Sequence, residues 1–159
     1  MKYVELLQKF KWFKERVVSK INMSVVEEKK VITEFLPEQL KELILSNDKT
    51  GKHCIVIKFT AEWCGPCKLI KELCHYKFNK MPENVILSEI DIDNSVELYM
   101  FLKRGKIRVV NGIPALLAWY PNDDRDENLW YLPDDSVAGS NVEGINYFFK
   151  QVNDMALDC

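Results

Sequence analysis

The chain lacks the features that mark membrane-spanning and nucleic-acid-binding proteins. No apolar run approaches the roughly 20 residues that a transmembrane helix needs. A basic surplus is also missing: the formal net charge is −2, whereas binding to phosphate backbones generally needs an excess of Lys and Arg. Internal repeats and low-complexity segments are absent as well. We therefore expect a globular protein that does not have nucleic acid as a partner.

The cysteines lack the regular spacing of a disulfide-stabilised scaffold, and their number is odd. The five are Cys54, Cys64, Cys67, Cys74 and Cys159. A secretory signal is also hard to find, because charged side chains interrupt every candidate apolar stretch within residues 1–20. These absences predict a cytoplasmic protein whose thiols are reduced by default.

The length of 159 residues fits one globular domain with some additional sequence. We assign residues 29–159 to that domain and residues 1–28 to an N-terminal extension. Within the extension, residues 1–22 hold six Lys or Arg against two Glu, a local charge of +4. Apolar residues at three-to-four spacing predict an amphipathic helix there. Such a helix packs on its own domain, or it contacts a membrane surface or a partner protein.

From residue 30 onward, strand-like and helix-like patterns alternate. The expected strands cover 30–35, 54–59, 85–92, 114–120 and 129–132, and the expected helices cover 37–45, 67–80, 95–104 and 140–153. This alternation predicts an α/β fold, in which helices cover both faces of a central mixed sheet that ends in an antiparallel hairpin. The hairpin connection, residues 121–128, is rich in acidic side chains, so we expect a solvated loop there.

The stretch F-T-A-E-W-C-G-P-C-K, residues 59–68, carries the clearest chemical signal. Cys64 stands where an expected strand ends and a helix begins, and unpaired backbone N–H groups and the helix dipole favour a thiolate there. Cys67 lies in the first helical turn, so its sulfur can face that of Cys64. Pro66 suits a helix start, and Gly65 leaves Cys64 open to a partner. The arrangement predicts thiol–disulfide exchange, with Cys64 as nucleophile and Cys67 as resolving thiol.

A Cys-x-x-Cys pair can also be half of a zinc site, which would need two further ligands nearby. The nearest candidates are Cys74 and His75. Cys74 lies seven residues beyond Cys67, about 10 Å along a helix, which is too far to share a tetrahedral site. We therefore expect no metal at the pair.

The segment W-C-G-P-C-K after an apolar strand resembles the active site of the thioredoxin family. Gly112-Ile113-Pro114 resembles the family's cis-proline segment, which lies opposite the dithiol and binds substrate backbone. Val137-Ala138-Gly139 resembles the family's last substrate-facing loop. The resemblance covers about Lys30 to Asn153 and implies a thioredoxin-like fold with an extra N-terminal helix. The substrate-binding residues that it implies are Trp63, Gly65, Pro66, Ile113, Pro114 and Gly139.

The resemblance also implies an activity, the reduction of disulfides in client proteins. No bound cofactor is implied, because the redox-active group is the Cys64–Cys67 disulfide itself. The electron donor that the family suggests is a thioredoxin reductase that uses NADPH. Two other interpretations stay open: a disulfide oxidase or isomerase in an oxidising compartment, and a redox-quiet binding or assembly module anchored by the N-terminal helix.

One pair of residues departs from the family pattern. Thioredoxins usually carry a buried Asp at the position of Lys58 and a Lys at the position of Glu89, so the two charges are exchanged here. We expect a reversed, buried ion pair beneath Cys67 that takes part in catalysis, because a lone buried Lys would be costly. Glu89 or neutral Lys58 would then assist proton transfer at the second cysteine, and charged Lys58 would stabilise thiolates. The alternative is that Lys58 only extends to solvent.

Overall fold

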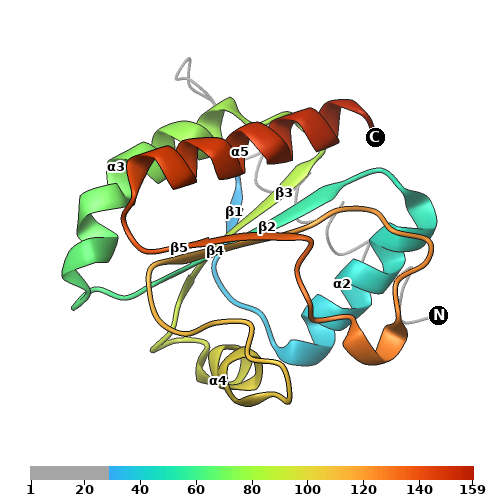
Figure 1. Ribbon diagram of the computed structural model, residues 1–159, viewed down its shortest axis with the longest axis horizontal. Helices are drawn as coiled ribbons and strands as arrows, with labels where there is room; N and C mark the ends of the chain where they lie inside the picture. Colours follow the sequence, from blue (N-terminus) through green and yellow to red (C-terminus); the bar gives the residue numbers. More distant parts are fainter. Residues whose placement is uncertain (1–28) are drawn as a thin grey trace, which may run out of the picture.

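Five strands form one mixed sheet in the computed structural model, which describes residues 29–159 (Figure 1). The strands are β1 (Val31–Ile32), β2 (Cys54–Thr60), β3 (Val85–Asp91), β4 (Ala115–Trp119) and β5 (Asp135–Ala138). Their order is β1-β3-β2-β4-β5. The pairs β1–β3 and β2–β3 are parallel, whereas β2–β4 and β4–β5 are antiparallel. β2 is therefore the central strand.

Two helices cover each face of the sheet, as the alternating pattern predicts. The helices are α2 (Pro37–Thr50), α3 (Gly65–Lys80), α4 (Val96–Arg104) and α5 (Val142–Leu157). Figure 1 shows α3 and α5 above the sheet and α2 and α4 below it. Both faces of β2 are covered, which explains its nearly continuous apolar sequence. The expected amphipathic helix in residues 1–22 lies outside the described residues.

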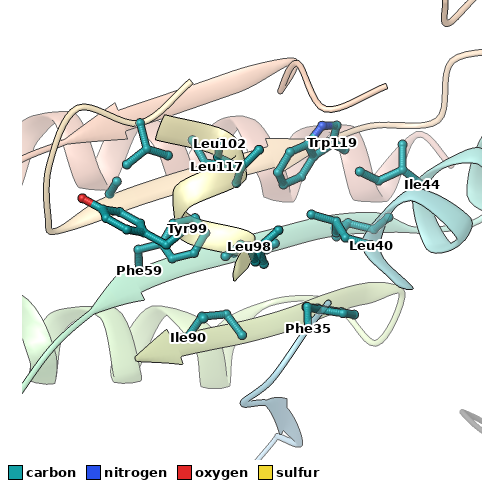
Figure 2. Close-up of a cluster of buried hydrophobic side chains, with 14 of the residues drawn as sticks. Phe35, Leu40, Ile44, Phe59, Ile90, Leu98, Tyr99, Leu102, Leu117 and Trp119 are labelled. Atoms are coloured by element: carbon teal, nitrogen blue, oxygen red, sulfur yellow. The ribbon is translucent and has the colours of Figure 1, made fainter. Parts of the chain in front are cut away.

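Side chains of alternating β2 residues enter two separate cores. Ile55, Ile57 and Phe59 pack with α2 and α4, in the cluster that Figure 2 shows. Cys54 and Val56 pack with α3 and α5 on the opposite face. This alternation follows from the two-residue period of a strand. Lys58 belongs by the same alternation to the face of α3 and α5, so a charged side chain enters that core.

Helix α2 is longer than its sequence pattern predicts. The expected end near Leu45 is wrong, because the helix continues to Thr50 and stops at Gly51, whose φ of 66° is left-handed. Gly tolerates that conformation because it has no Cβ. After the helix, the Asn47 side chain holds the backbone of His53 by two hydrogen bonds of 2.6 and 3.0 Å.

The strand expected at residues 129–132 is wrong, and β5 follows it at Asp135–Ala138. Trp130 is buried and stacks on Phe101 of α4 with ring centroids 5.5 Å apart. Tyr131 packs edge-on against both rings. The aromatic residues that suggested a strand therefore pack on a helix, and a short 3₁₀ turn at Glu127–Leu129 takes the place of a tight hairpin.

The acidic connection between β4 and β5 is anchored by one buried cation. Arg125 Nε donates to Asp48 Oδ2 at 2.8 Å, and its Nη2 donates to Asp134 Oδ2 and to the Tyr120 carbonyl, each at 2.8 Å. The Arg125 side chain is only 6 % exposed. The acidic side chains of the loop are exposed as expected, but the loop is held to α2 through Asp48.

Replacing this cation should destabilise the fold. Arg125→Ala leaves the nearly buried Asp48 carboxylate without its partner, and we expect the free energy of unfolding to fall by about 3 kcal/mol. Urea denaturation at pH 7 measures the change. Lys150→Ala removes the exposed Lys150–Asp154 pair on α5 and is the matched control, with an expected loss under about 0.5 kcal/mol. Equal losses in the two variants would contradict a structural role for Arg125.

Candidate functional site

Cys64 lies between the end of the central strand and the start of a helix. β2 ends at Thr60 and α3 begins at Gly65, so Cys64 is the N-cap residue of α3. Its Sγ accepts the backbone N–H of Cys67 at 3.2 Å. An N-cap acceptor satisfies one of the N–H groups that have no partner within the helix, and negative charge is favoured at this end of the helix dipole. The sulfur of Cys64 therefore takes the place that a Ser or Asp oxygen takes in other helices.

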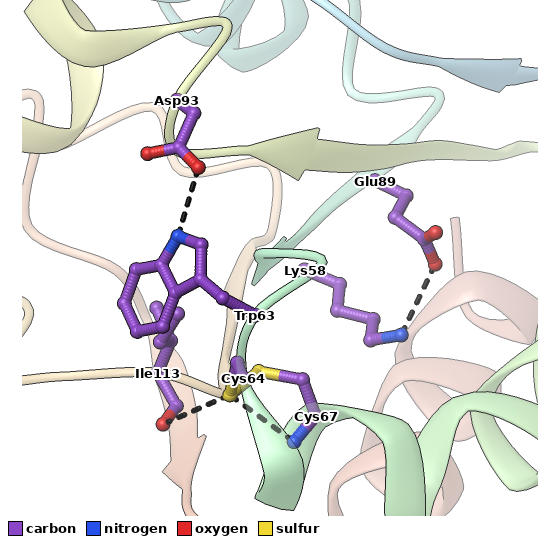
Figure 3. Close-up of a disulfide and its surroundings, with 7 residues drawn as sticks. All are labelled: Lys58, Trp63, Cys64, Cys67, Glu89, Asp93 and Ile113. Carbon is purple, nitrogen blue, oxygen red and sulfur yellow. Dashed lines mark hydrogen bonds and ion pairs between the residues drawn. A yellow bond between two sulfur atoms is a disulfide. The ribbon is translucent and has the colours of Figure 1, made fainter.

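Cys64 and Cys67 form a disulfide across the first turn of α3, with their Cα atoms 5.2 Å apart (Figure 3). The two sulfurs thus face one another as the spacing predicts. The expectation that Cys64 is open to a partner needs correction, because Cys64 is only 4 % exposed and Cys67 only 2 %. Ala61 belongs to the same buried cluster as the pair, and Ile92 and Ile113 pack against that cluster. Little of either cysteine is therefore accessible from solvent.

The cis-proline segment meets the dithiol, and Gly139 meets that segment. The Ile113–Pro114 peptide bond is cis, and the Ile113 carbonyl O lies 3.9 Å from Cys64 Sγ. The N–H of Gly139 donates to the Pro114 carbonyl at 2.9 Å, at the open end of the β4–β5 hairpin. Gly139 has a φ of 84°, a conformation that favours glycine. The loop expected at residues 137–139 is wrong in part, because Val137 and Ala138 belong to β5.

The rim around the disulfide is exposed. Trp63 keeps 66 % of its surface accessible, and Gly65 and Pro66 are also exposed. A Cβ added at Gly65 would meet no atom of residues 29–159 within 4 Å. The described part of the chain therefore leaves the surface beside Cys64 open, although Cys64 itself is nearly covered.

A carboxylate that the sequence analysis did not single out orients Trp63. The indole Nε1–H donates to Asp93 Oδ2 at 2.8 Å. Trp63 and Asp93 also line an open hollow of about 540 Å³, together with Glu62, Asp91 and Asn94. The carboxyl ends of the neighbouring parallel strands β2 and β3 meet here. The contact between Trp63 and Asp93 was predictable from the parallel pairing of β2 and β3, because residues that follow two adjacent parallel strands lie at one edge of the sheet.

Lys58 and Glu89 form the expected ion pair. They occupy paired positions on β2 and β3, and Lys58 Nζ lies 3.1 Å from Glu89 Oε2. The Lys58 side chain is 1 % exposed, but that of Glu89 is 37 % exposed, so the expectation that both partners are buried is wrong. The reason is the short β1, which pairs with Leu87 and Ser88 and ends before Glu89. Figure 3 shows the Lys58 ammonium directed toward Glu89 and away from the disulfide.

The charges of this ion pair affect the pKa of Cys74. Cys74 is fully buried on α3. Burial raises the pKa of Cys74 to about 11, the charge of Lys58 lowers it, and the charge of Glu89 raises it. Burial is the largest of these effects, so the Cys74 thiol stays protonated at neutral pH and behaves as a core residue.

Residues 29–159 contain neither a cluster of metal ligands nor a helix able to span a membrane. In that part of the chain, no group of three or more His, Cys, Asp or Glu side chains is arranged to hold a metal ion. None of the helices between these residues is long and apolar enough to cross a bilayer.

The fold and the site together define a class of protein. It is an α/β protein in which the central strand of a mixed sheet leads into a Cys-x-x-Cys disulfide at the N-terminus of a helix. The family model of thioredoxin matches residues 31–129. The chain therefore belongs to the thioredoxin family, which confirms the resemblance and the fold predicted from the sequence.

The relatives match parts of the chain. A thioredoxin from Ophiophagus hannah is 42 % identical over 67 residues, which cover 42 % of this chain and 55 % of the relative. A thioredoxin H-type from Ricinus communis is 38 % identical over 81 residues, which cover 44 % of this chain and 64 % of the relative. The matches thus span less than two thirds of these relatives' own length.

Solved thioredoxin structures resemble the chain over a longer range. A thioredoxin from Nicotiana alata superposes with a TM-score of 0.57 at 20 % identity, covering 82 % of this chain and 99 % of its own. A thioredoxin from Malassezia sympodialis gives a TM-score of 0.56 at 18 % identity, covering 84 % and 99 %. At this identity the similarity supports the fold alone.

Removing the two partners of the Lys58–Glu89 pair separately should affect stability unequally. Glu89→Gln leaves Lys58 buried without its counter-charge, so we expect the free energy of unfolding to fall by about 2 kcal/mol. Lys58→Met leaves a carboxylate that still reaches water, so we expect a loss under about 1 kcal/mol. Urea unfolding at pH 7 measures both. Equal losses would contradict the unequal burial of the pair.

Proposed function

We propose that the chain is a protein-disulfide reductase that works through the Cys64–Cys67 dithiol. The observation that carries the proposal is the position of the disulfide. It spans the first turn of α3, where Cys64 Sγ accepts the N–H of Cys67, and it adjoins the Ile113 carbonyl. A sulfur at a helix N-terminus is stabilised as the thiolate, which is the reactive form in disulfide exchange.

The reaction begins with the reduced dithiol. The Cys64 thiolate attacks one sulfur of a client disulfide, so that the client S–S bond breaks and its other sulfur leaves as a thiolate that takes up a proton. The product is a mixed disulfide between Cys64 and the client. Cys67 then loses its proton and attacks Cys64 Sγ, and the second client sulfur leaves. The client has gained two electrons and two protons, and the chain carries the Cys64–Cys67 disulfide.

The exposed rim around the disulfide is the proposed client-binding surface. Trp63, Gly65 and Pro66 offer an accessible surface next to Cys64. Backbone of Ile113–Pro114 and Gly139 borders the opposite side. An extended client segment that lies along this backbone would bring its disulfide to Cys64, and the small exposure of Cys64 would restrict attack to disulfides presented in that way.

Lys58 and Glu89 are proposed to affect the ionisation of the dithiol and proton transfer at Cys67. Lys58 lies on the α3 face of β2, and its charge together with that of Glu89 already acts on Cys74 of the same helix. Positive charge at Lys58 favours thiolates. Glu89, which reaches water, or neutral Lys58 is proposed to assist proton transfer at Cys67. Lys58→Met should raise the pH at which the dithiol ionises. An unchanged titration would remove Lys58 from the mechanism.

The partners follow from this activity. Clients are proteins with accessible disulfides, and the electron donor is a thioredoxin reductase that uses NADPH. We place the reaction in the cytoplasm, where a reducing environment regenerates the dithiol. Residues 29–159 form the catalytic unit, and residues 1–28 are an extension that packs on this domain or contacts a membrane surface or a partner.

Insulin reduction with dithiothreitol tests the proposal directly. Cys64→Ser should reduce the rate of insulin precipitation to that of dithiothreitol alone, because the nucleophile is lost. Cys67→Ser, reduced and then freed of dithiothreitol, should trap a mixed disulfide between Cys64 and insulin, which peptide mapping without reduction identifies. Cys74→Ser is the matched control and should keep the activity of the unmodified chain. Full activity in Cys64→Ser would contradict the assignment, and inactivity of the unmodified chain would favour a redox-quiet binding module.

A further inference from the structure

Two more cysteines lie near the end of the sheet that is remote from the dithiol. Cys54 is the first residue of β2, and Cys159 lies just beyond the end of α5. Figure 1 shows the C-terminus beside the start of β2, whereas α3 begins at the other end of that strand. Cys54 is fully buried and Cys159 is exposed. Both are free thiols.

Asn84 holds the end of α5 against the start of β2. Its carbonyl accepts the N–H of Cys54 at 3.1 Å, and its side-chain Nδ2 donates to the Ala156 carbonyl at 2.8 Å. The same Nδ2 also donates to the Lys52 carbonyl at 3.2 Å. Ala156 packs with Cys54 in one buried cluster. These contacts fix the segment that carries Cys159 beside Cys54.

Backbone contacts at the end of α5 place Cys159 near Cys54. The N–H of Cys159 donates to the Ala156 carbonyl at 3.4 Å, its Sγ lies 3.1 Å from the Met155 carbonyl, and Ala156 packs with Cys54. Burial raises the pKa of Cys54 to about 12, and Cys159 adds to this rise. Because Cys54 is buried and Cys159 is exposed, a reagent from solvent meets Cys159 first.

We propose that Cys54 and Cys159 form a second, reversible disulfide that is independent of the Cys64–Cys67 pair. The oxidant is a low-molecular-weight disulfide such as glutathione disulfide. The site is thus a redox-modification site that links the start of β2 to the end of α5. It does not rest on the proposed reductase activity, because the oxidant alone accepts the electrons.

The exchange proceeds in two steps. The Cys159 thiol loses its proton and attacks one sulfur of glutathione disulfide, so that the glutathione S–S bond breaks and one glutathione leaves. Cys54 then loses its proton to solvent and attacks Cys159 Sγ, and the second glutathione leaves. Two protein thiols are oxidised to one disulfide, and one glutathione disulfide is reduced to two glutathione molecules. The high pKa of Cys54 makes Cys159 the first nucleophile and Cys54 the second.

Thiol counting on the full 159-residue chain tests the proposal. The chain, with its Cys64–Cys67 disulfide intact, is incubated with glutathione disulfide, quenched with acid, denatured and alkylated. We expect the free thiols to fall from three to one, with Cys74 as the thiol that remains. Peptide mapping without reduction should find Cys54 joined to Cys159. Dithiothreitol, which also reduces the Cys64–Cys67 disulfide, should then expose all five cysteine thiols.

Two variants keep the test independent of folding defects. Cys74→Ser is the matched control and should still form the Cys54–Cys159 link, so that no thiol remains. Cys159→Ser changes an exposed residue and should leave both remaining thiols, at Cys54 and Cys74, unreacted. Four results would each overturn the proposal: three thiols that persist, a stable glutathione adduct at Cys159 beside a free Cys54, a Cys159–Cys159 dimer, or loss of the Cys54 thiol in Cys159→Ser.

Discussion

The hydrogen bond from the Cys67 N–H to Cys64 Sγ is the interaction on which the site depends. β2 is paired on both sides and covered on both faces, so its end at Thr60 is held firmly by the sheet. The chain then turns into α3 with Cys64 as the capping residue. Capping the helix and stabilising negative charge on the sulfur are therefore one and the same contact. The reactivity that we propose comes first from helix geometry, and the positive charge of Lys58 adds to it.

The cysteines around the central strand β2 lie in three different environments. The dithiol follows its carboxyl end, at the edge where the rim residues are exposed. Cys74 lies in the core beside the Lys58–Glu89 pair and stays protonated because it is buried. Cys54, at the other end of the strand, is buried, whereas Cys159 near the end of α5 is exposed. Burial and access, rather than residue type, thus decide what each sulfur can do.

The ion pair shows how a charge exchange is accommodated in this fold. The parallel register of β2 and β3 places positions 58 and 89 side by side. This holds whether the positive charge is at position 58 or at position 89. The exchange places the cation at the buried position and the carboxylate at the position that water reaches. A longer β1 would cover Glu89 and make the pair more costly to bury, so the two-residue edge strand is part of the reason that the exchange is tolerated.

Features set by local sequence were predictable, and features set by distant contacts were not. The helix start at Cys64 follows from neighbouring residues, and the Lys58–Glu89 contact follows from the strand order of the family. The position of β5 was missed because Trp130 and Tyr131 look strand-like but pack on Phe101 of α4. The Arg125 anchor was missed because its partner Asp48 lies 77 residues away. Long-range pairs of this kind leave no periodic pattern in the sequence.

The central claim is that folding makes Cys64 ionise more readily than an ordinary thiol. The most direct test is the pH dependence of iodoacetamide alkylation at Cys64 in the reduced chain, compared between native conditions and urea. The account predicts that the midpoint of the alkylation rate lies at least about one pH unit lower in the folded chain than in the unfolded chain, where it should lie near the ordinary value of about 8.5. Equal midpoints in the two states would contradict it.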